Sequence, residues 1–90
     1  MIYLVGRHRV SDYARWKAAF DGRAEARRAA GLELLQCWRA LDDPGNVFFV
    51  FEVADLARAR AFVVRWDDAP GTFESELHFV ERAAGCPPCG

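Results

Sequence analysis

The sequence has no excess of charge of either sign and no long apolar run. Its 90 residues carry a formal net charge of -1 at pH 7, so no field favours nucleic acid or acidic lipid. No apolar stretch approaches the length of a membrane span, and residues 1–5 are too short and uncharged for a signal peptide. We expect a cytoplasmic protein that binds neither nucleic acid nor membrane.

Cysteines are few, and motifs for metal, phosphate or triad chemistry are missing. Three cysteines, an odd number, argue against a secreted disulfide scaffold. Cys86 and Cys89 have the spacing of redox and zinc sites, but the chain ends one residue later, where a redox motif needs a helix. We expect residues 83–90 to form a flexible tail, with a zinc site shared by two tails as the alternative. No metal or cofactor is expected.

Apolar residues, in contrast, are abundant. They make up 52% of the chain, and aromatic residues alone make up 13%. A domain of this length buries a smaller share of its surface than a large one. So much apolar material is more than one monomer is expected to enclose, and this predicts self-association.

The hydrophobic spacing predicts four strands and two helices. Strands are expected over residues 2–10, 32–41, 47–53 and 76–81, with a hairpin turn between the second and third. A helix capped by Ser11 or Asp12 should run to Gly31, with Tyr13, Trp16, Phe20 and Ala24 on one stripe. Asp55 should cap a second helix, whose stripe is Leu56, Ala59, Val63 and Trp66.

This order is the α+β, ferredoxin-like βαββαβ plan. Residues 1–82 would form one domain: a four-stranded antiparallel sheet with both helices on one face. The bare face should then pack against a second copy, which gives a dimeric α/β barrel. Trp38 alternates with Leu34 and Gln36, and its side chain is expected to face that partner.

A longer pattern resembles a known family. Its residues are Arg7-His8-Arg9-Val10, Asp12-Tyr13, Trp16-Lys17, Phe20-Asp21, Arg27, Gly31, Arg39, Asp42-Asp43-Pro44, Asn46-Val47, Asp55-Leu56, Ala59 and Phe62. They resemble small bacterial proteins of the dimeric α/β-barrel superfamily, near the antibiotic biosynthesis monooxygenase-like domains. The resemblance implies a homodimer with one cavity per subunit between sheet and helices. It ends after Phe62, and the Cys-Pro-Pro-Cys tail lies outside it.

Histidine and arginine are the candidate catalytic residues. His8 lies on the first strand and has an ordinary pKa suited to acid–base work. Because the first strand neighbours the fourth in this topology, His8 and His78 could share a cavity. Helical geometry places Arg27 between Trp16 and Phe20, where it either extends to solvent or meets an anion. Each of these residues also has a purely structural interpretation.

The aromatic residues Tyr13, Trp16, Phe20 and Trp66 would form the walls of a substrate site, or simply the core. The resemblance implies cofactor-independent monooxygenase, cyclase or isomerase chemistry on an apolar aromatic or polyketide-like molecule. In that reaction His8 would be the base, and Arg27 or His78 would stabilise an oxyanion. The alternatives are a non-catalytic ligand-sensing dimer and a haem-binding protein with a histidine ligand.

Overall fold

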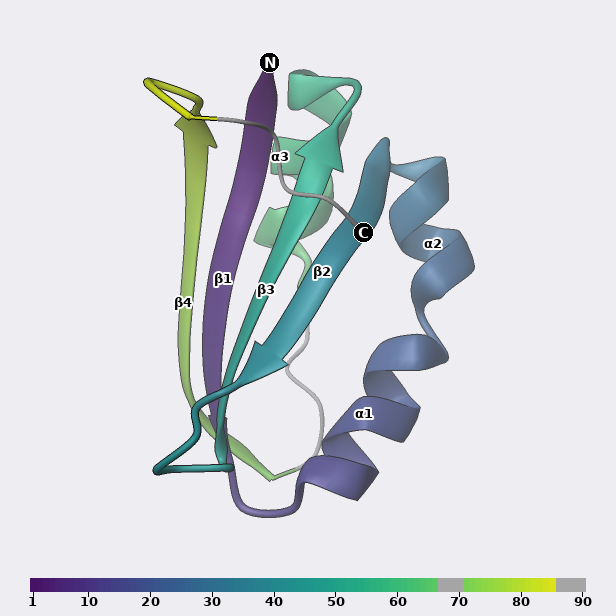
Figure 1. Cartoon of the computed structure of the whole chain (residues 1–90). Coiled ribbons are helices and arrows are strands. Elements are labelled where there is room, and N and C mark those ends of the chain that lie inside the picture. The colour runs from purple at the N-terminus through teal and green to yellow at the C-terminus, as the bar shows by residue number, and fades with distance from the viewer. Residues whose placement is uncertain (67–70, 86–90) are drawn as a thin grey trace.

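We describe a computed structural model of the chain over residues 1–66 and 71–85. The strands are β1 (Ile2–Val10), β2 (Leu32–Arg39), β3 (Asn46–Val53) and β4 (Thr72–Glu81), and the helices are α1 (Tyr13–Asp21), α2 (Ala24–Ala29) and α3 (Leu56–Val64). The strands form one antiparallel sheet in the order β2-β3-β1-β4. The helices lie together behind and beside it (Figure 1). The predicted ferredoxin-like α+β fold is confirmed.

The first predicted helix is in fact two. α1 ends at Asp21, Gly22 caps it, and α2 begins at Ala24. Glycine has a low helix propensity. The Gly22 amide makes the last i→i−4 bond, to the Ala18 carbonyl, and the Arg23 amide then bonds the Phe20 carbonyl three residues back, which tightens the turn and ends the helix. The prediction of one helix reaching Gly31 is therefore wrong, although Gly31 itself ends α2 with a φ of +80°, as expected.

Two aspartates fix where the longer helices begin. The carboxylate of Asp12 accepts a hydrogen bond from the Arg15 amide, and that of Asp55 accepts one from the Arg58 amide. Each bond satisfies an amide that has no partner in the first helical turn. Asp12, rather than Ser11, is therefore the cap of α1.

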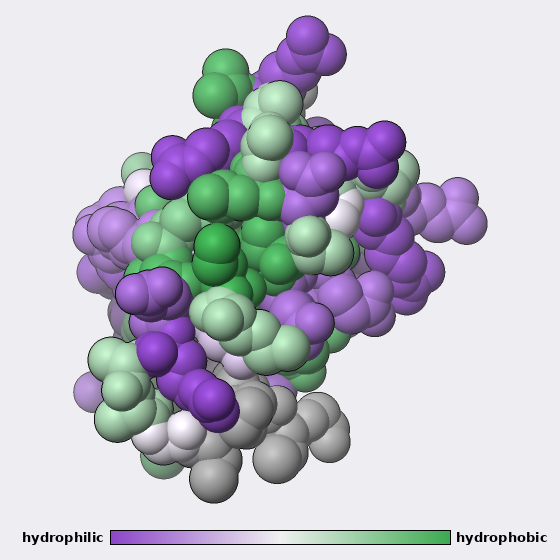
Figure 2. Space-filling model, turned by 90° about the horizontal axis from the view of Figure 1, so that it is seen from above, coloured by the Kyte–Doolittle hydropathy of each residue, from purple (hydrophilic) through white to green (hydrophobic). Residues whose placement is uncertain are grey.

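The core lies between the sheet and the helices, and phenylalanines of β3 form its centre. Phe49 and Phe51 are fully buried and pack against Trp16 and Phe20 of α1. Gly6 makes this possible, because a side chain there would overlap the Phe49 ring. Seen from the end that carries the N-terminus, hydrophobic residues gather at the centre within a hydrophilic rim (Figure 2).

A bulge in β2 changes which side chains face the helices. Leu34 pairs with Phe51, whereas Gln36 pairs with Val50 and Trp38 with Phe48. Since paired residues share a face, Leu34 lies on the helix side and Trp38 on the opposite side. The predicted alternation of Leu34 with Gln36 and Trp38 is wrong, because the extra residue of a bulge shifts the period by one.

We call the side of the sheet away from the helices the open face. The strand pairings place these residues on it: Tyr3, Val5, Arg7, Arg9, Gln36, Trp38, Asn46, Phe48, Val50, Glu52, Glu74, Glu76, His78 and Val80. Tyr3 and Val50 are buried among their neighbours, while Val5, Val80 and Trp38 are exposed. The middle of the open face is thus apolar.

The last strand and the last helix have other bounds than the sequence predicted. β4 begins at Thr72, four positions before the predicted start. α3 ends at Val64, so Trp66 lies two residues beyond the helix on which it was predicted. The turn at residues 67–70 and the Cys86–Cys89 motif fall outside the described residues.

Candidate functional site

A cavity opens between α1, α2, α3 and the first strand, and we call it the aromatic cavity. It is lined by His8, Trp16, Ala19, Phe20, Arg23, Arg27, Phe62 and Trp66. The structure therefore brings together five residues that the sequence predicted for one site: His8, Trp16, Phe20, Arg27 and Trp66. Among the described residues it has room of about 20 Å³ for the centres of water-sized molecules, which is space for about one water.

His8 lies at the base of this cavity and is 1% exposed. It stands on β1 on the helix side of the sheet, opposite Val47 of β3. The rings of Trp16, Phe49 and Trp66 meet it edge to face, with centroids 5.0–6.2 Å away. The Trp16 indole N–H donates a hydrogen bond of 3.0 Å to His8 Nδ1.

That hydrogen bond determines which His8 nitrogen carries the proton. An indole nitrogen can only donate, so the Nδ1 atom that accepts from it has no hydrogen. Neutral His8 is therefore protonated on Nε2 and is a donor through that atom. Proton abstraction by Nδ1 would require the bond from Trp16 to break, which makes the geometry poorly suited to the base role predicted for His8.

Arg27 is buried, with 3% of its surface exposed. Its Nη1 donates a 2.7 Å hydrogen bond to the Phe20 carbonyl at the end of α1, and the guanidinium lies 4.0 Å from the centre of the Phe20 ring. Burial lowers the pKa of Arg27, and repulsion from Arg23 and Arg28 adds to that effect while Asp21 opposes it. The guanidinium nevertheless stays charged at neutral pH, and no carboxylate of the described residues forms a salt bridge with it.

Trp66 and Phe62 close the cavity from the α3 side. Their rings meet edge to face at 5.7 Å, and the Trp66 ring lies parallel to Phe49 at 6.3 Å. Trp66 is half-buried and belongs to no helix; its amide bonds the Val63 carbonyl just past the end of α3. This wall is consequently held by ring contacts and one backbone bond.

His78 does not join His8, so the prediction of a shared cavity is wrong. The register pairs His78 with Val5, whereas His8 pairs with Ser75. Strand neighbours that differ by one position point to opposite faces. His78 is therefore an exposed residue of the open face, on the other side of the sheet from the aromatic cavity.

Tyr13 also lies apart from the cavity lining. Its ring stacks on Trp16 at 5.9 Å, and the Arg39 guanidinium covers it at 3.8 Å. Sequence reasoning missed three lining residues, Ala19, Arg23 and Phe62. Ala19 lies three positions after Trp16, while Arg23 and Phe62 lie four positions before Arg27 and Trp66, so helical spacing was the signal that could have found them.

The described residues contain no group of three or more histidine, cysteine, aspartate or glutamate side chains placed to hold a metal. None of their helices has the length and apolar character needed for a membrane crossing. For the haem alternative, His8 would have to give up the Trp16 bond to ligate through Nδ1. The room beside it fits about one water, far less than a macrocycle needs.

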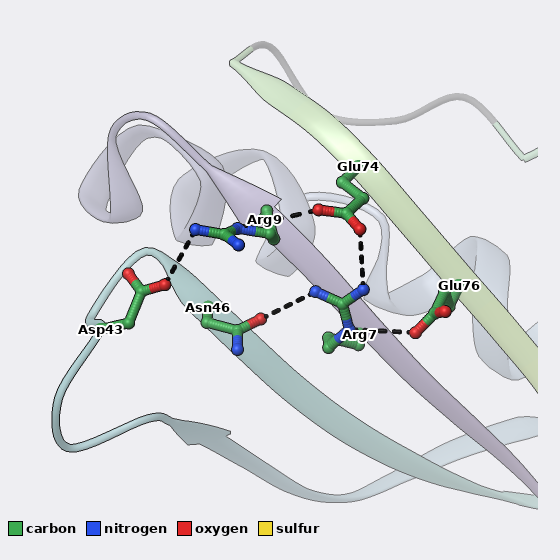
Figure 3. A network of polar contacts seen from close by, with 6 residues as sticks. All are labelled: Arg7, Arg9, Asp43, Asn46, Glu74 and Glu76. Carbon is green, nitrogen blue, oxygen red and sulfur yellow. Dashed lines mark hydrogen bonds and ion pairs between the residues drawn. The ribbon is translucent and has the colours of Figure 1, made fainter.

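A charged network occupies one end of the open face (Figure 3). Its members are Arg7, Arg9, Asp43, Asn46, Glu74 and Glu76. Arg7 donates hydrogen bonds to Glu74 and Glu76 at 3.0 Å and to Asn46 at 3.2 Å, while Arg9 contacts Asp43 at 3.0 Å. The hydrogen bonds that Arg7 donates to Glu74 and Glu76 raise its pKa. The apolar middle of the open face is therefore bordered at this end by charged side chains.

No family model matches the chain, and no curated protein matches it either. Solved structures do. A candidate antibiotic biosynthesis monooxygenase from Deinococcus radiodurans superposes with a TM-score of 0.67 at 16% identity, covering 100% of both chains. An uncharacterised NIPSNAP domain protein from Burkholderia xenovorans superposes with a TM-score of 0.66 at 17% identity, covering 97% of this chain and 99% of that one. The chain therefore has the ferredoxin-like fold that antibiotic biosynthesis monooxygenase-like proteins share.

Proposed function

We propose that the protein binds a small, apolar aromatic anion, a carboxylate or an enolate, in the aromatic cavity. The observation that carries this proposal is Arg27. A buried cation without a carboxylate partner among the described residues shares one cavity with the rings of Trp16, Phe20, Phe62 and Trp66. A buried charge is costly unless it is paired, and an anionic ligand would supply the missing partner.

The chemistry that fits this pair of features is stabilisation of a substrate anion. The positive field of Arg27 favours the phenolate of a bound phenol, or the enolate of a bound 1,3-dicarbonyl, over the neutral form. Cofactor-independent oxygenation, cyclisation and isomerisation can all begin from such an anion. The aromatic rings orient the substrate and exclude water.

Ligand entry requires one wall to move, because the cavity has room for only about one water. We assign this movement to Trp66. It lies outside α3, and among the described residues the contacts given for its ring are with neighbouring rings. A swing of this side chain would open the cavity without breaking a helix or a strand.

Binding of 2-naphthoate, compared with 2-naphthamide, tests the proposal. Titration calorimetry should show that the wild type prefers the carboxylate, and Arg27→Met should lose about 10- to 100-fold in affinity for it, the value of a charge-assisted hydrogen bond. Arg28→Met removes an exposed arginine of the same helix and is the matched control. Equal affinity of wild type and a folded Arg27→Met protein for 2-naphthoate would refute the proposal.

Catalysis is tested separately with an oxygen electrode and a panel of phenols and 1,3-diketones. Turnover that depends on Arg27 would support an enzyme. Binding that is followed by no turnover of any member, and by no isomerised or cyclised product, would instead support the ligand-sensing alternative.

We further propose that the open face pairs two copies of the chain. Val5 and Val80 are 38% and 39% exposed, and Trp38 is 46% exposed, beside buried Tyr3 and Val50. Such an apolar sheet surface is what a sheet-on-sheet dimer buries. Sedimentation velocity should find a dimer that Val5→Asp dissociates and Val64→Asp, an exposed change on α3, leaves intact. A wild-type monomer at high concentration would contradict this proposal.

A further inference from the structure

A second, larger hollow lies on the outer side of Arg27, between the helices α1 and α2 and the edge strand β2. We call it the outer hollow. It is lined by Asp21, Ala24, Arg27, Arg28, Leu32, Glu33 and Leu34. It offers about 350 Å³ to the centres of water-sized molecules, against about 20 Å³ in the aromatic cavity. Volumes of a few hundred Å³ are typical of small-molecule sites.

The outer hollow is lined by two carboxylates, Asp21 and Glu33, and by two guanidinium groups, Arg27 and Arg28. Both carboxylates have a salt bridge to another residue: Lys17, outside the lining, lies 2.7 Å from Asp21, and Arg28 lies 3.5 Å from Glu33. Arg27 forms no salt bridge with a carboxylate of the described residues. Arg27, which is 3% exposed, lines both the outer hollow and the aromatic cavity.

The remaining lining is aliphatic rather than aromatic. Leu32 and Leu34 of β2 form one wall, and Ala24 at the start of α2 forms the opposite one. Leu32 and Leu34 share this side of the sheet by ordinary alternation, because the β2 bulge lies after Leu34. A buried arginine without a salt bridge to any described carboxylate, beside two leucines, fits a ligand that carries one negative charge on a short hydrocarbon chain.

We propose that the outer hollow is a binding site for a short-chain aliphatic carboxylate, whose carboxylate contacts Arg27 and whose chain packs on Leu32 and Leu34. The site shares Arg27 with the aromatic cavity, but its other walls are different. Ala24 lines only the outer hollow and Ala19 only the aromatic cavity, so the two sites can be blocked one at a time.

Hexanoate is the probe, and hexanol at matched ionic strength is its neutral counterpart. In amide-detected NMR titrations hexanoate should shift the signals of Ala24 and Leu34 and bind at least about tenfold more tightly than hexanol. Ala24→Phe, which fills the outer hollow, should abolish hexanoate binding and keep 2-naphthoate binding. Ala19→Phe should do the reverse, and Arg27→Met should weaken both.

Each contrary outcome bears on one proposal only. Hexanoate binding that survives Ala24→Phe, or hexanol that binds equally well, would overturn the outer-hollow site and leave the aromatic cavity proposal intact. A wild-type protein that binds hexanoate but not 2-naphthoate would overturn the aromatic cavity proposal and leave the outer-hollow site intact. If Ala24→Phe does not fold, as judged by circular dichroism, the wild-type titration decides, because absent shifts at Ala24 and Leu34 overturn the site.

Discussion

Replacing Trp16 by phenylalanine should remove the hydrogen bond that keeps neutral His8 in one tautomer. In the wild type the Trp16 indole N–H donates to His8 Nδ1 at 3.0 Å, with both residues buried. Phenylalanine keeps a ring at this position but has no donor. We expect neutral His8 to change from a single Nε2-protonated form to a mixture of both tautomers.

The cost to stability follows from the same contact. A buried acceptor left without its donor costs about 1–3 kcal/mol, and the void left by the smaller ring adds about 1–2 kcal/mol. The sum, about 2–5 kcal/mol, is within the roughly 5–15 kcal/mol stability of a small domain, so the variant should still fold. Trp66→Phe makes the same change of ring next to His8 without removing this bond, and only the void term should apply to it.

Two-bond proton–nitrogen NMR spectra of the imidazole measure the tautomer directly. The chain has only two histidines, so a His78→Gln background leaves the His8 signals alone. In the wild type and in Trp66→Phe, Nδ1 should resonate as an unprotonated nitrogen, and in Trp16→Phe the two nitrogen shifts should move toward each other. A protonated Nδ1 in the wild type, or unchanged shifts in Trp16→Phe, would refute the reasoning.

Three further predictions concern stability and reactivity. Gly6→Ala should lower the free energy of unfolding in urea by about 1–3 kcal/mol, because its methyl group would overlap Phe49, while Gly22→Ala, at a φ of -63°, should cost nothing; equal costs would contradict this. Asp55→Ala should cost about 1 kcal/mol through loss of its helix cap, and a thermal shift no larger than that of an exposed Asp42→Ala would count against it. Burial raises the pKa of the Cys37 thiol above its ordinary 9.0, so with Cys86 and Cys89 changed to serine, iodoacetamide at pH 8 should modify native protein more slowly than urea-unfolded protein. Because the unfolded thiol ionises first, this burial stabilises the fold fully below pH 9.0 and its contribution is lost as the pH rises further; equal modification rates would show that the thiol is not protected.

The fold was predictable because its signals are local. Alternation in β1, the turn cluster after β2 and the aspartate caps of α1 and α3 depend on residues close in sequence. The β2 bulge and the extra length of β4 were not predictable in this way. They depend on pairing with strands far along the chain, since Leu34 and Gln36 take their register from Phe51 and Val50 of β3.

The candidate site was predictable in membership but not in geometry. Aromatic spacing identified Trp16, Phe20 and Trp66, and all three line the aromatic cavity. The face that His78 occupies depends on the β1–β4 register, which pairs it with Val5. A shift of one residue in that register would have placed it on the helix side of the sheet, and composition alone carries no information about such a shift.

Arg27 shows how a correct neighbourhood can follow from an incorrect helix. One continuous helix would place Arg27 between Trp16 and Phe20, yet the chain leaves the helix at Gly22. In a continuous helix the Phe20 carbonyl would accept from the amide of residue 24; here it accepts from the Arg23 amide and from the Arg27 guanidinium. The break thus creates the acceptor that draws Arg27 inward. Spacing rules describe side chains on an intact helix, so they cannot predict that a carbonyl freed at a break will bury a charge and place it between two cavities.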